Sequence, residues 1–548
     1  MSSSNLNLSN QRILVIDDLV DSRSIMKRML TELGAERIDT AVDGDQAIMM
    51  INDTDYDLVL SDYNLGRGKD GQQVLEEARY TKRLRARSIF IMVTGENASD
   101  MVMGALEYEP DSYITKPITL KSLSQRLGRI MQGRRIMASM HQLMDAGKTQ
   151  EAIAEAERLI ASQPRMMALV SRGLGPLYIH QEEYNNAIRV YSMVLNQHFH
   201  SWARLGQAIC MHKLGDSLSA LALLKETLRR QPRHVQCYDW MARIYLSLGD
   251  QVYAQKLLVK AVEISPRAVL RQRELGQLAL QNQEWQVAAS AFEQAVRLGR
   301  HSCYKSIDAY LNYADAALPL IESDKVTYKR LGDKVQRVLT DLQQDFSQSI
   351  ALKYAGVLAQ ARICHAMGLL ERGLLRLNAA EHLFREMEVP DADDALSLTS
   401  TMIQCGEHVR AEDLLRTVKG MTLSAAQQAR VEQQANTLNE AAIRQHSDQV
   451  NAEGVSLYEQ GEYIRAMKAF DEAADYSEAG VSVLLNAIQV RVSLIHYGPC
   501  SQDQRRQLLF QCRPLFQRIG VVGNTDERFE RFQRLKNNFT RLLQEPAS

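Results

Sequence analysis

The sequence predicts two folds in one chain: an α/β domain with a doubly wound parallel sheet, followed by an all-α superhelical solenoid. Short apolar runs near the start each lead into a polar, chemically active residue, as buried parallel strands often do. Farther along, Ala220, Ala254 and Ala288 recur every 34 residues, a spacing typical of stacked helical pairs. The composition, 45% hydrophobic and 24% charged, is that of a globular chain.

Four apolar runs define the expected sheet. They lie at residues 13–16, 58–61, 89–93 and 113–115, and amphipathic stretches with helical spacing separate them. Open parallel sheets bind their ligands at the carboxyl ends of the strands. The residues that follow the runs are therefore expected to converge: Asp17, Asp18, Asp62, Thr94 and Lys116.

The three acidic residues of this set predict a metal site. The carboxylates of Asp17, Asp18 and Asp62 repel one another unless a cation joins them, and a few carboxylates with waters suit Mg²⁺. Asn64, two residues beyond Asp62, is placed to offer its backbone carbonyl as a further ligand.

The same set predicts phosphoryl transfer to a carboxylate. A cation beside Asp62 can neutralise the charge that moves onto it with a phosphoryl group, which makes a weak carboxylate nucleophile competent. Lys116 adds a second positive charge, and the Thr94 hydroxyl can hydrogen-bond a phosphoryl oxygen. Gly95 leaves room for that group to approach.

With these residues in this order, residues 11–130 resemble the CheY-like receiver domain of bacterial two-component response regulators, which has a flavodoxin-like fold. The resemblance implies that Asp62 is the phosphoacceptor, Thr94 the switch hydroxyl and Lys116 the phosphate-sensing lysine, with the acidic doublet in the magnesium site. Tyr113 matches the family's switch aromatic. In that family, phosphorylation pulls the threonine inward and the aromatic follows.

The resemblance also predicts how the site is tuned and read. Asn64 and Glu96 match positions that set the rate of dephosphorylation, and this polar pair resembles members whose phosphoryl group is short-lived. The loop at 63–71 lacks the family's usual proline and looks about one residue longer, so we expect it to be more flexible. The face that changes on phosphorylation would include residues 101–108 and 120–127.

The second half resembles the tetratricopeptide repeat (TPR), in which small residues let two antiparallel helices pack closely. One copy of the pattern reads Met241, Ala242, Tyr245, Gly249, Ala254, Leu258, Ala261 and Pro266. We expect a tail at 1–10, a helical joint at 131–145, TPR repeats at 134–300, degenerate helical repeats at 301–450, a further repeat at 451–478 and capping helices at 479–548. The joint is expected to be nearly continuous helix from Leu120 to Met144, interrupted only by Gly128 and Gly133.

Stacked helical pairs form a superhelix whose concave groove suits a peptide or a partner helix. The predicted function of this half is therefore protein binding. From their positions relative to the packing alanines, the residues expected to face the groove are Trp202, Asp239, Arg243, Arg273 and Gln277.

Several other classes of site are disfavoured. Gly147-Lys148-Thr149 looks like the end of a phosphate-binding P-loop, but Gln142 stands where that motif needs glycine. The 12 histidines and 7 cysteines form no His-Glu-x-x-His or Cys-x-x-Cys motif, which suits packing thiols in a reducing cytosol. The start has neither the basic nor the apolar part of a signal peptide, so a cytoplasmic location is expected. A net charge of −1 does not suggest nucleic acid.

The leading hypothesis is a phosphorylation-switched adaptor. Its phosphoryl group would come from a histidine kinase or a histidine phosphotransfer protein, and its repeats would bind a protein target. Two alternatives stay open: a constitutive scaffold whose receiver is a phosphate sink or docking module, and a regulator linked to nucleic acid through its repeats. An enzyme with its own substrate is disfavoured because the transient aspartyl phosphate is the only convergent chemistry. The target, the state that binds it and homodimerisation also stay open.

Overall fold

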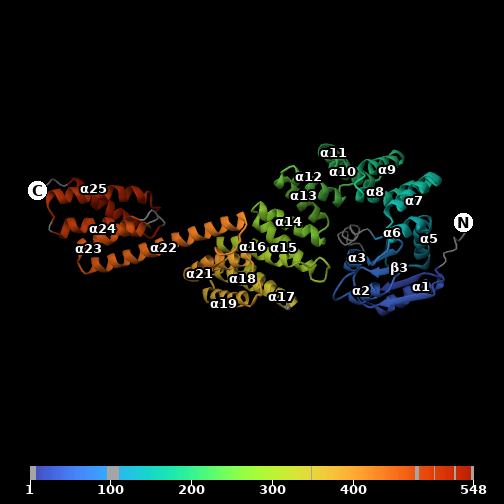
Figure 1. Cartoon of the computed structure of the whole chain (residues 1–548), viewed down its shortest axis with the longest axis horizontal. Coiled ribbons are helices and arrows are strands. Elements are labelled where there is room, and N and C mark those ends of the chain that lie inside the picture. Colours follow the sequence, from blue (N-terminus) through green and yellow to red (C-terminus); the bar gives the residue numbers. More distant parts are fainter. Residues whose placement is uncertain are drawn as a thin grey trace. The chain divides into compact units, whose positions relative to one another are not determined.

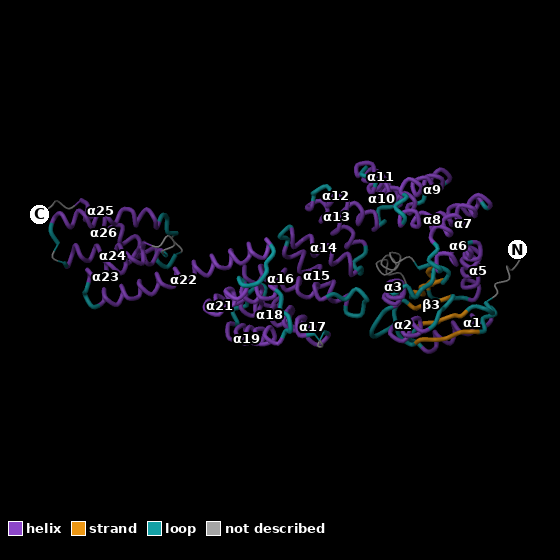
Figure 2. The backbone as a smooth tube through the Cα atoms, in the orientation of Figure 1, coloured by secondary structure: helices purple, strands orange, loops and turns teal. Residues whose placement is uncertain are grey.

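The computed structural model describes residues 8–95, 110–346, 349–475, 480–498, 500–523 and 526–544. The chain divides into two compact units, residues 1–368 and 369–548 (Figure 1). The first unit holds the only strands among the described residues, and the second is helical (Figure 2). The predicted fold class, an α/β domain followed by a helical repeat region, is therefore confirmed.

The α/β domain has a five-stranded parallel sheet with strand order β2-β1-β3-β4-β5. Its strands are β1 (Arg12–Ile16), β2 (Arg37–Ala41), β3 (Leu58–Asp62), β4 (Ile89–Thr94) and β5 (Ser112–Thr115). Four of these are the predicted apolar runs. The sequence did not predict β2, because three of its five residues are polar and only Ala41 is buried, as expected of an edge strand.

Helices cover both faces of this sheet, so its inner strands β1, β3 and β4 are buried on both sides and are apolar along most of their length. The helices are α1 (Val20–Glu32), α2 (Gly44–Asp53), α3 (Gly71–Tyr80) and α5 (Leu120–Ile136). One face packs its strand residues against α2 and α3, and the other against α1 and α5. This is the doubly wound arrangement that the sequence predicts.

The joint to the repeats breaks at a different place from the one predicted. Gly128 and Gly133 both lie inside α5, and the helix ends at Met137, where φ is −90° and ψ is 9°. A glycine inside a helix costs only about 1 kcal/mol, which the packing of flanking side chains can offset. Met137 is buried in the core of the first repeat instead, and α6 (Ala138–Asp145) begins directly after it.

The joint is pinned to the α/β domain by polar contacts. Arg134 donates hydrogen bonds to the carbonyl oxygens of Ala86 (2.6 Å) and Ser88 (3.0 Å), and forms an ion pair with Asp111. On α6, Asp145 accepts a hydrogen bond of 2.7 Å from the backbone N–H of Ala86. Both helices of the joint therefore hold the same receiver loop.

His141 is a buried titratable group at this joint. It is 5% exposed, and its Nε2 lies 3.4 Å from an Arg134 nitrogen. Burial, and then the nearby guanidinium, lower the pKa of His141 from 6.5 to about 4. Between pH 6.5 and pH 4, His141 is protonated in the unfolded chain but neutral in the folded chain. The free energy of unfolding therefore falls as the pH is lowered through this range.

We expect the first unit to lose about 2 kcal/mol of stability between pH 7 and pH 5 from His141 alone. Chemical unfolding at both pH values, followed by hydrogen exchange of the first unit, measures the loss. Since other groups also titrate, the control is His141→Gln, in which the pH dependence should shrink by that amount. An unchanged pH dependence in this variant would contradict the assignment.

The repeats of the first unit are antiparallel helical pairs in sequence order. Their helices are α7 (Thr149–Ser162), α8 (Met167–His180), α9 (Tyr184–Gln197), α10 (Ser201–Lys213), α11 (Ser217–Arg230), α12 (Val235–Ser247), α13 (Gln251–Ile264), α14 (Val269–Gln281) and α15 (Trp285–Gly299). The predicted packing residues Ala220, Ala254 and Ala288 are fully buried. Tyr191 fills the space beside two glycines of its neighbours, Gly175 and Gly206, where a Cβ would clash with its ring.

Three longer helices complete the first unit, in the region where the repeat signature fades. They are α16 (Ile307–Ser323), α17 (Lys329–Asp345) and α18 (Ile350–Ala366). Their buried residues share one core with α15, in which Tyr313 is fully buried. Helical packing thus continues here, with small residues such as Ala314 and Ala317 of α16 and Ala359 of α18 buried in the shared core.

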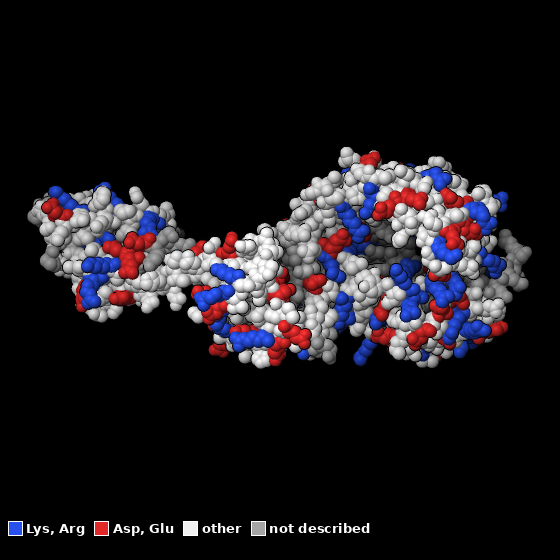
Figure 3. Space-filling model, in the orientation of Figure 1, with Lys and Arg blue, Asp and Glu red and all other residues white. Residues whose placement is uncertain are grey.

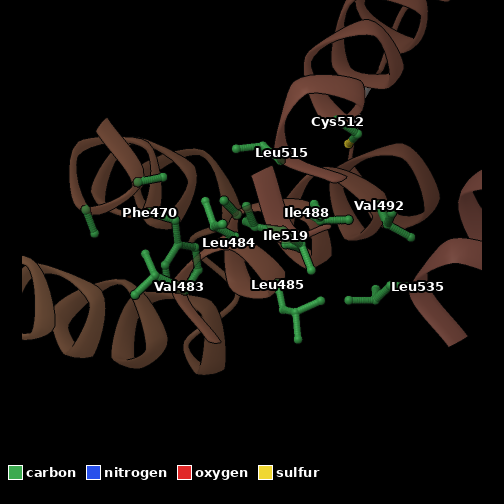
Figure 4. Close-up of a cluster of buried hydrophobic side chains, with 14 of the residues drawn as sticks. Phe470, Val483, Leu484, Leu485, Ile488, Val492, Cys512, Leu515, Ile519 and Leu535 are labelled. Carbon is green, nitrogen blue, oxygen red and sulfur yellow. The ribbon is translucent and has the colours of Figure 1, made fainter. Parts of the chain in front are cut away.

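The second unit consists of helices α19 (Leu370–Glu386), α20 (Ala392–Gln404), α21 (His408–Val418), α22 (Ala425–Glu459), α23 (Tyr463–Asp475), α24 (Val481–Tyr497), α25 (Gln502–Ile519) and α26 (Phe529–Gln544). The later repeat copy spans the end of α22 and α23, where Phe470 packs against Gly454 as Phe292 packs against Gly276. Phe470 and Ile488 belong to the core of this unit (Figure 4). Over the described parts of both units, no helix has the length and apolarity to cross a membrane.

Candidate functional site

The predicted acidic residues meet at the carboxyl end of the sheet. Asp17 follows β1 and is fully buried, Asp18 is exposed beside it, and Asp62 ends β3 with 6% exposure. One carboxylate oxygen from each lies within 4.8 Å of those of the other two. They are brought together because β1 and β3 are parallel neighbours in the sheet.

Lys116 joins two of these carboxylates. It follows β5, and its Nζ donates to Asp17 Oδ2 at 2.9 Å and to Asp62 Oδ2 at 2.8 Å. Burial lowers the pKa of Lys116, but its hydrogen bonds to Asp62 and Asp17 outweigh burial and raise the pKa, so the lysine stays charged. Burial raises the pKa of Asp62, although the contact with Lys116 opposes this.

The charges of this cluster do not balance. Three carboxylates face one ammonium group, and Arg23 donates to the backbone carbonyl of Asp17 rather than to a carboxylate. Hard oxygen ligands with excess negative charge are what a small divalent cation requires. Within the described ranges, no other group of three metal-ligating side chains lies so close together.

Three other predicted receiver residues lie on or just after the strands β3, β4 and β5. Thr94 ends β4 and is 5% exposed, and its carbonyl accepts a 2.7 Å hydrogen bond from the backbone N–H of Lys116. Tyr113, on β5, packs against the core on the α2 and α3 side. Asn64 is exposed in the loop after β3, and its side chain accepts a hydrogen bond from Gly66 N. Glu96 lies outside the described residues, as do residues 101–108.

The loop after Asp62 makes an ion pair, a hydrogen bond and a close contact with its neighbours. Gly66 has a positive φ of 74° and lies so close to Asp18 that a Cβ would sit 3.1 Å from its Oδ2. Lys69 forms an ion pair with Asp45 at the start of α2. Asp70 accepts from Gln73 N at 2.9 Å and caps α3. These contacts tie the loop to α2, α3 and Asp18, and its greater flexibility relative to the family stays a prediction.

Three of the five residues predicted to face the groove line a cavity of the repeats. Trp202, Asp239 and Arg243 line one cavity of about 710 Å³ on the repeats, and Arg273 and Gln277 do not line it. Asp239 is bound to the buried Arg271 by hydrogen bonds of 2.7 and 2.8 Å, so its charge is neutralised within the repeats. Their binding roles stay predictions.

Sequence reasoning missed Arg271, which is 4% exposed and binds Asp239 from the next repeat. A signal exists, since an acid and a base 32 residues apart stand at nearly equivalent positions of successive repeats. Arg243 is similarly engaged, with Glu274 at 3.5 Å and the Trp240 ring at 5.3 Å. Lys/Arg and Asp/Glu side chains are interspersed on the molecular face drawn in Figure 3.

Comparison with known proteins supports the predictions for both halves of the chain, the receiver domain and the repeats. A family model described as a response regulator receiver domain matches residues 13–128, and one described as a tetratricopeptide repeat matches residues 273–319. The chain is 31% identical to chemotaxis protein CheY-3 of Vibrio cholerae over 123 residues, which are 22% of this chain and 93% of that protein. It is 30% identical to chemotaxis protein CheY of Pseudomonas aeruginosa over 121 residues, 22% of this chain and 96% of that one.

A solved structure aligns with the helical region. It is a tetratricopeptide repeat protein from Parabacteroides merdae, with 16% identity and a TM-score of 0.28, and the alignment covers 50% of this chain and 99% of that one.

Proposed function

The chain belongs to the two-component response regulators, as a receiver domain joined to tetratricopeptide repeats, and we propose that phosphorylation of Asp62 controls which protein its repeats bind. The observation that carries this proposal is the cluster of Asp17, Asp18 and Asp62 with Lys116 bonded across it. Receiver domains exchange phosphoryl groups with histidine kinases or phosphotransfer proteins, so such a protein is the proposed donor.

Phosphoryl transfer would form an acyl phosphate on Asp62. A carboxylate oxygen of Asp62 attacks the phosphorus, the P–N bond to the donor histidine breaks, and its electron pair returns to the imidazole. Asp17, Asp18, Asp62 and the carbonyl of Asn64 would hold Mg²⁺, which when bound offsets charge on the phosphoryl oxygens. Lys116 is already within hydrogen-bond distance of Asp62, so it can hold the transferred group without a large movement.

The switch would follow from new contacts of the phosphoryl group. The Thr94 hydroxyl lies at the end of the neighbouring strand and can donate to a phosphoryl oxygen, and Tyr113 lies on the next strand beyond. A rearrangement of these two side chains would bias the receiver between two states. The joint pinned by Arg134 then offers a route from the receiver to the repeats.

Hydrolysis of the acyl phosphate would be the only chemistry of the chain itself, with no separate substrate. A location in the cytoplasm, where kinases and phosphotransfer proteins would meet it, belongs to the same proposal. The competing possibilities are a scaffold that binds its partner in both states and a regulator linked to nucleic acid.

The test is a pull-down from cytosolic extract with the full chain and Mg²⁺, with and without beryllofluoride as an aspartyl phosphate mimic. We expect recovery of at least one protein to change by about 5- to 150-fold, the range that ordinary coupling energies of about 1–3 kcal/mol produce. Asp62→Asn is the matched control, in which the mimic should have no effect.

Other outcomes distinguish the competing functions. A partner recovered equally with and without the mimic would overturn the switch and favour the constitutive scaffold. Recovery of nucleic acid that falls steeply as salt rises would instead favour the nucleic-acid regulator.

A further inference from the structure

The repeats contact the receiver along α3, far from the joint in sequence. Gln73 Nε2 donates to the carbonyl of Leu298 at 3.1 Å, and Ser302 Oγ donates to Glu76 Oε2 at 3.2 Å. At the end of α3, the rings of Tyr80 and Tyr304 meet edge to face with centroids 5.6 Å apart. The end of α15 and the segment that follows it therefore lie along α3, from its first turn to Tyr80.

Arg267 extends this contact to the phosphorylation loop. It lies between α13 and α14, and its Nη2 donates to Asp70 Oδ2 at 2.9 Å. The same guanidinium lies over the ring of Tyr63, 5.4 Å from its centroid. One repeat side chain thus touches the first and the last residue of the loop at 63–70.

Backbone hydrogen bonds hold both ends of that loop next to Asp62. Tyr63 directly follows Asp62, and its backbone N–H donates to Val93 O at 2.8 Å. Gly71 N donates to Tyr63 O at 2.9 Å, which closes the loop beside the backbone of Asp62. Asn64, the proposed carbonyl ligand, lies within the closed loop.

We propose that Arg267 is a positioning residue for the chemistry at Asp62, so that a repeat side chain sets the geometry of the receiver's metal-binding loop. This rests on the proposed phosphorylation of Asp62 and adds its regulation. A partner that shifts α13 and α14 would then change the affinity of the site for Mg²⁺ and the lifetime of the aspartyl phosphate. By linkage, occupation of the site would change affinity for that partner equally.

The Arg267–Asp70 pair is sheltered enough to matter. The two side chains are 32% and 21% exposed, so solvent screens them less than it screens a surface pair. Burial raises the pKa of Asp70, and the guanidinium of Arg267 counteracts this. Without Arg267, the Asp70 charge would lose its partner and the loop would relax toward solvent.

The experiment compares Arg267→Met with wild type in the full chain, using acetyl phosphate as the phosphoryl donor. Its two readouts are the Mg²⁺ concentration for half-maximal phosphorylation and the half-life of the phosphoryl group after the donor is removed. Partners beyond the direct ligands often change metal affinity about 10-fold or more. We expect a rise of about 3- to 10-fold in the half-maximal Mg²⁺ concentration and a changed half-life.

Two matched variants separate positioning from general loosening. Arg300→Met removes an exposed arginine from the same stretch of repeats, where it pairs with Asp341, and should leave both readouts at wild-type values. Asp70→Asn keeps the helix cap, because Asn caps as well as Asp, but loses the ion pair. It should reproduce Arg267→Met, and the double variant should add little. Arg267→Lys, with charge but no planar fork, should restore part of the effect.

The outcomes separate the two proposals. No phosphorylation of the wild-type chain by this donor, by a kinase or by a phosphotransfer protein would overturn the proposed function. Normal phosphorylation with the same Mg²⁺ dependence and half-life in wild type, Arg267→Met and Arg300→Met would overturn only the role of Arg267. Equal changes in both arginine variants would likewise overturn it, since they would reflect general loosening of the repeats.

Discussion

Replacement of Asp62 by Asn is expected to remove all phosphorylation of the receiver while leaving its fold intact. An amide oxygen is a poor nucleophile and carries no charge for a divalent cation, so neither the acyl phosphate nor the full metal site can form. Burial already raises the pKa of Asp62, which means that its ionised form is costly in the folded chain. Without metal, Asp62→Asn should therefore unfold at the same temperature as wild type or a higher one.

The measurement is incorporation of acid-stable, base-labile phosphate from acetyl phosphate, with thermal unfolding in EDTA on the same samples. Asp53→Asn is the control, because Asp53 is exposed at the end of α2 and is not one of the three clustered carboxylates. Wild-type incorporation in Asp62→Asn would place the phosphoacceptor elsewhere. A large drop in unfolding temperature would mean that Asp62 has a structural role.

Gly71→Ala should destabilise the receiver by about 3 kcal/mol, the upper part of the usual range for overpacking a core. A Cβ at this position would overlap the carbonyl oxygen of Asp62 and lie 2.8 Å from Ser61 Oγ. Neither group can yield cheaply, since both belong to β3 at the centre of the sheet. The start of α3 or the end of β3 must shift.

Urea unfolding monitored by hydrogen exchange of the receiver measures this loss. Gly95→Ala is the matched control: it directly follows β4 near the same site, but a Cβ there meets no atom of the described residues within 4 Å. We expect its stability to stay within about 0.5 kcal/mol of wild type. Similar unfolding curves for the two variants would show that the Gly71 contact is easily relieved.

The sequence predicted the receiver well because its signals are local. Each chemical residue stands where an apolar run ends, and a parallel sheet necessarily brings such ends together, as the cluster around Asp62 shows. The buried alanines of the repeats are equally local, since a fixed period marks them. Position in the sequence was enough to locate these residues in space.

The remaining features depend on contacts between distant segments. Nothing near Arg267 in the sequence indicates that it binds Asp70, 197 residues away. The sequence predicts Asp239 as a groove-facing residue, but in the structure Arg271 of the next repeat forms an ion pair with it. The break at Met137 depends on a core that the first repeat supplies, rather than on the glycines nearby. Such features follow from packing, which composition and periodicity do not specify.

The contact along α3 also carries a thiol that can report on it. Cys303 adjoins Ser302 at this contact, and burial, followed by the charges of Glu76 and Glu77 on α3, raises its pKa to about 11. The thiolate is the reactive form of cysteine, so alkylation at neutral pH is suppressed while receiver and repeats are in contact. Separation would remove the charges of Glu76 and Glu77 from the surroundings of this thiol. The rate at which Cys303 is alkylated therefore reports, from a native side chain, whether this interface is closed.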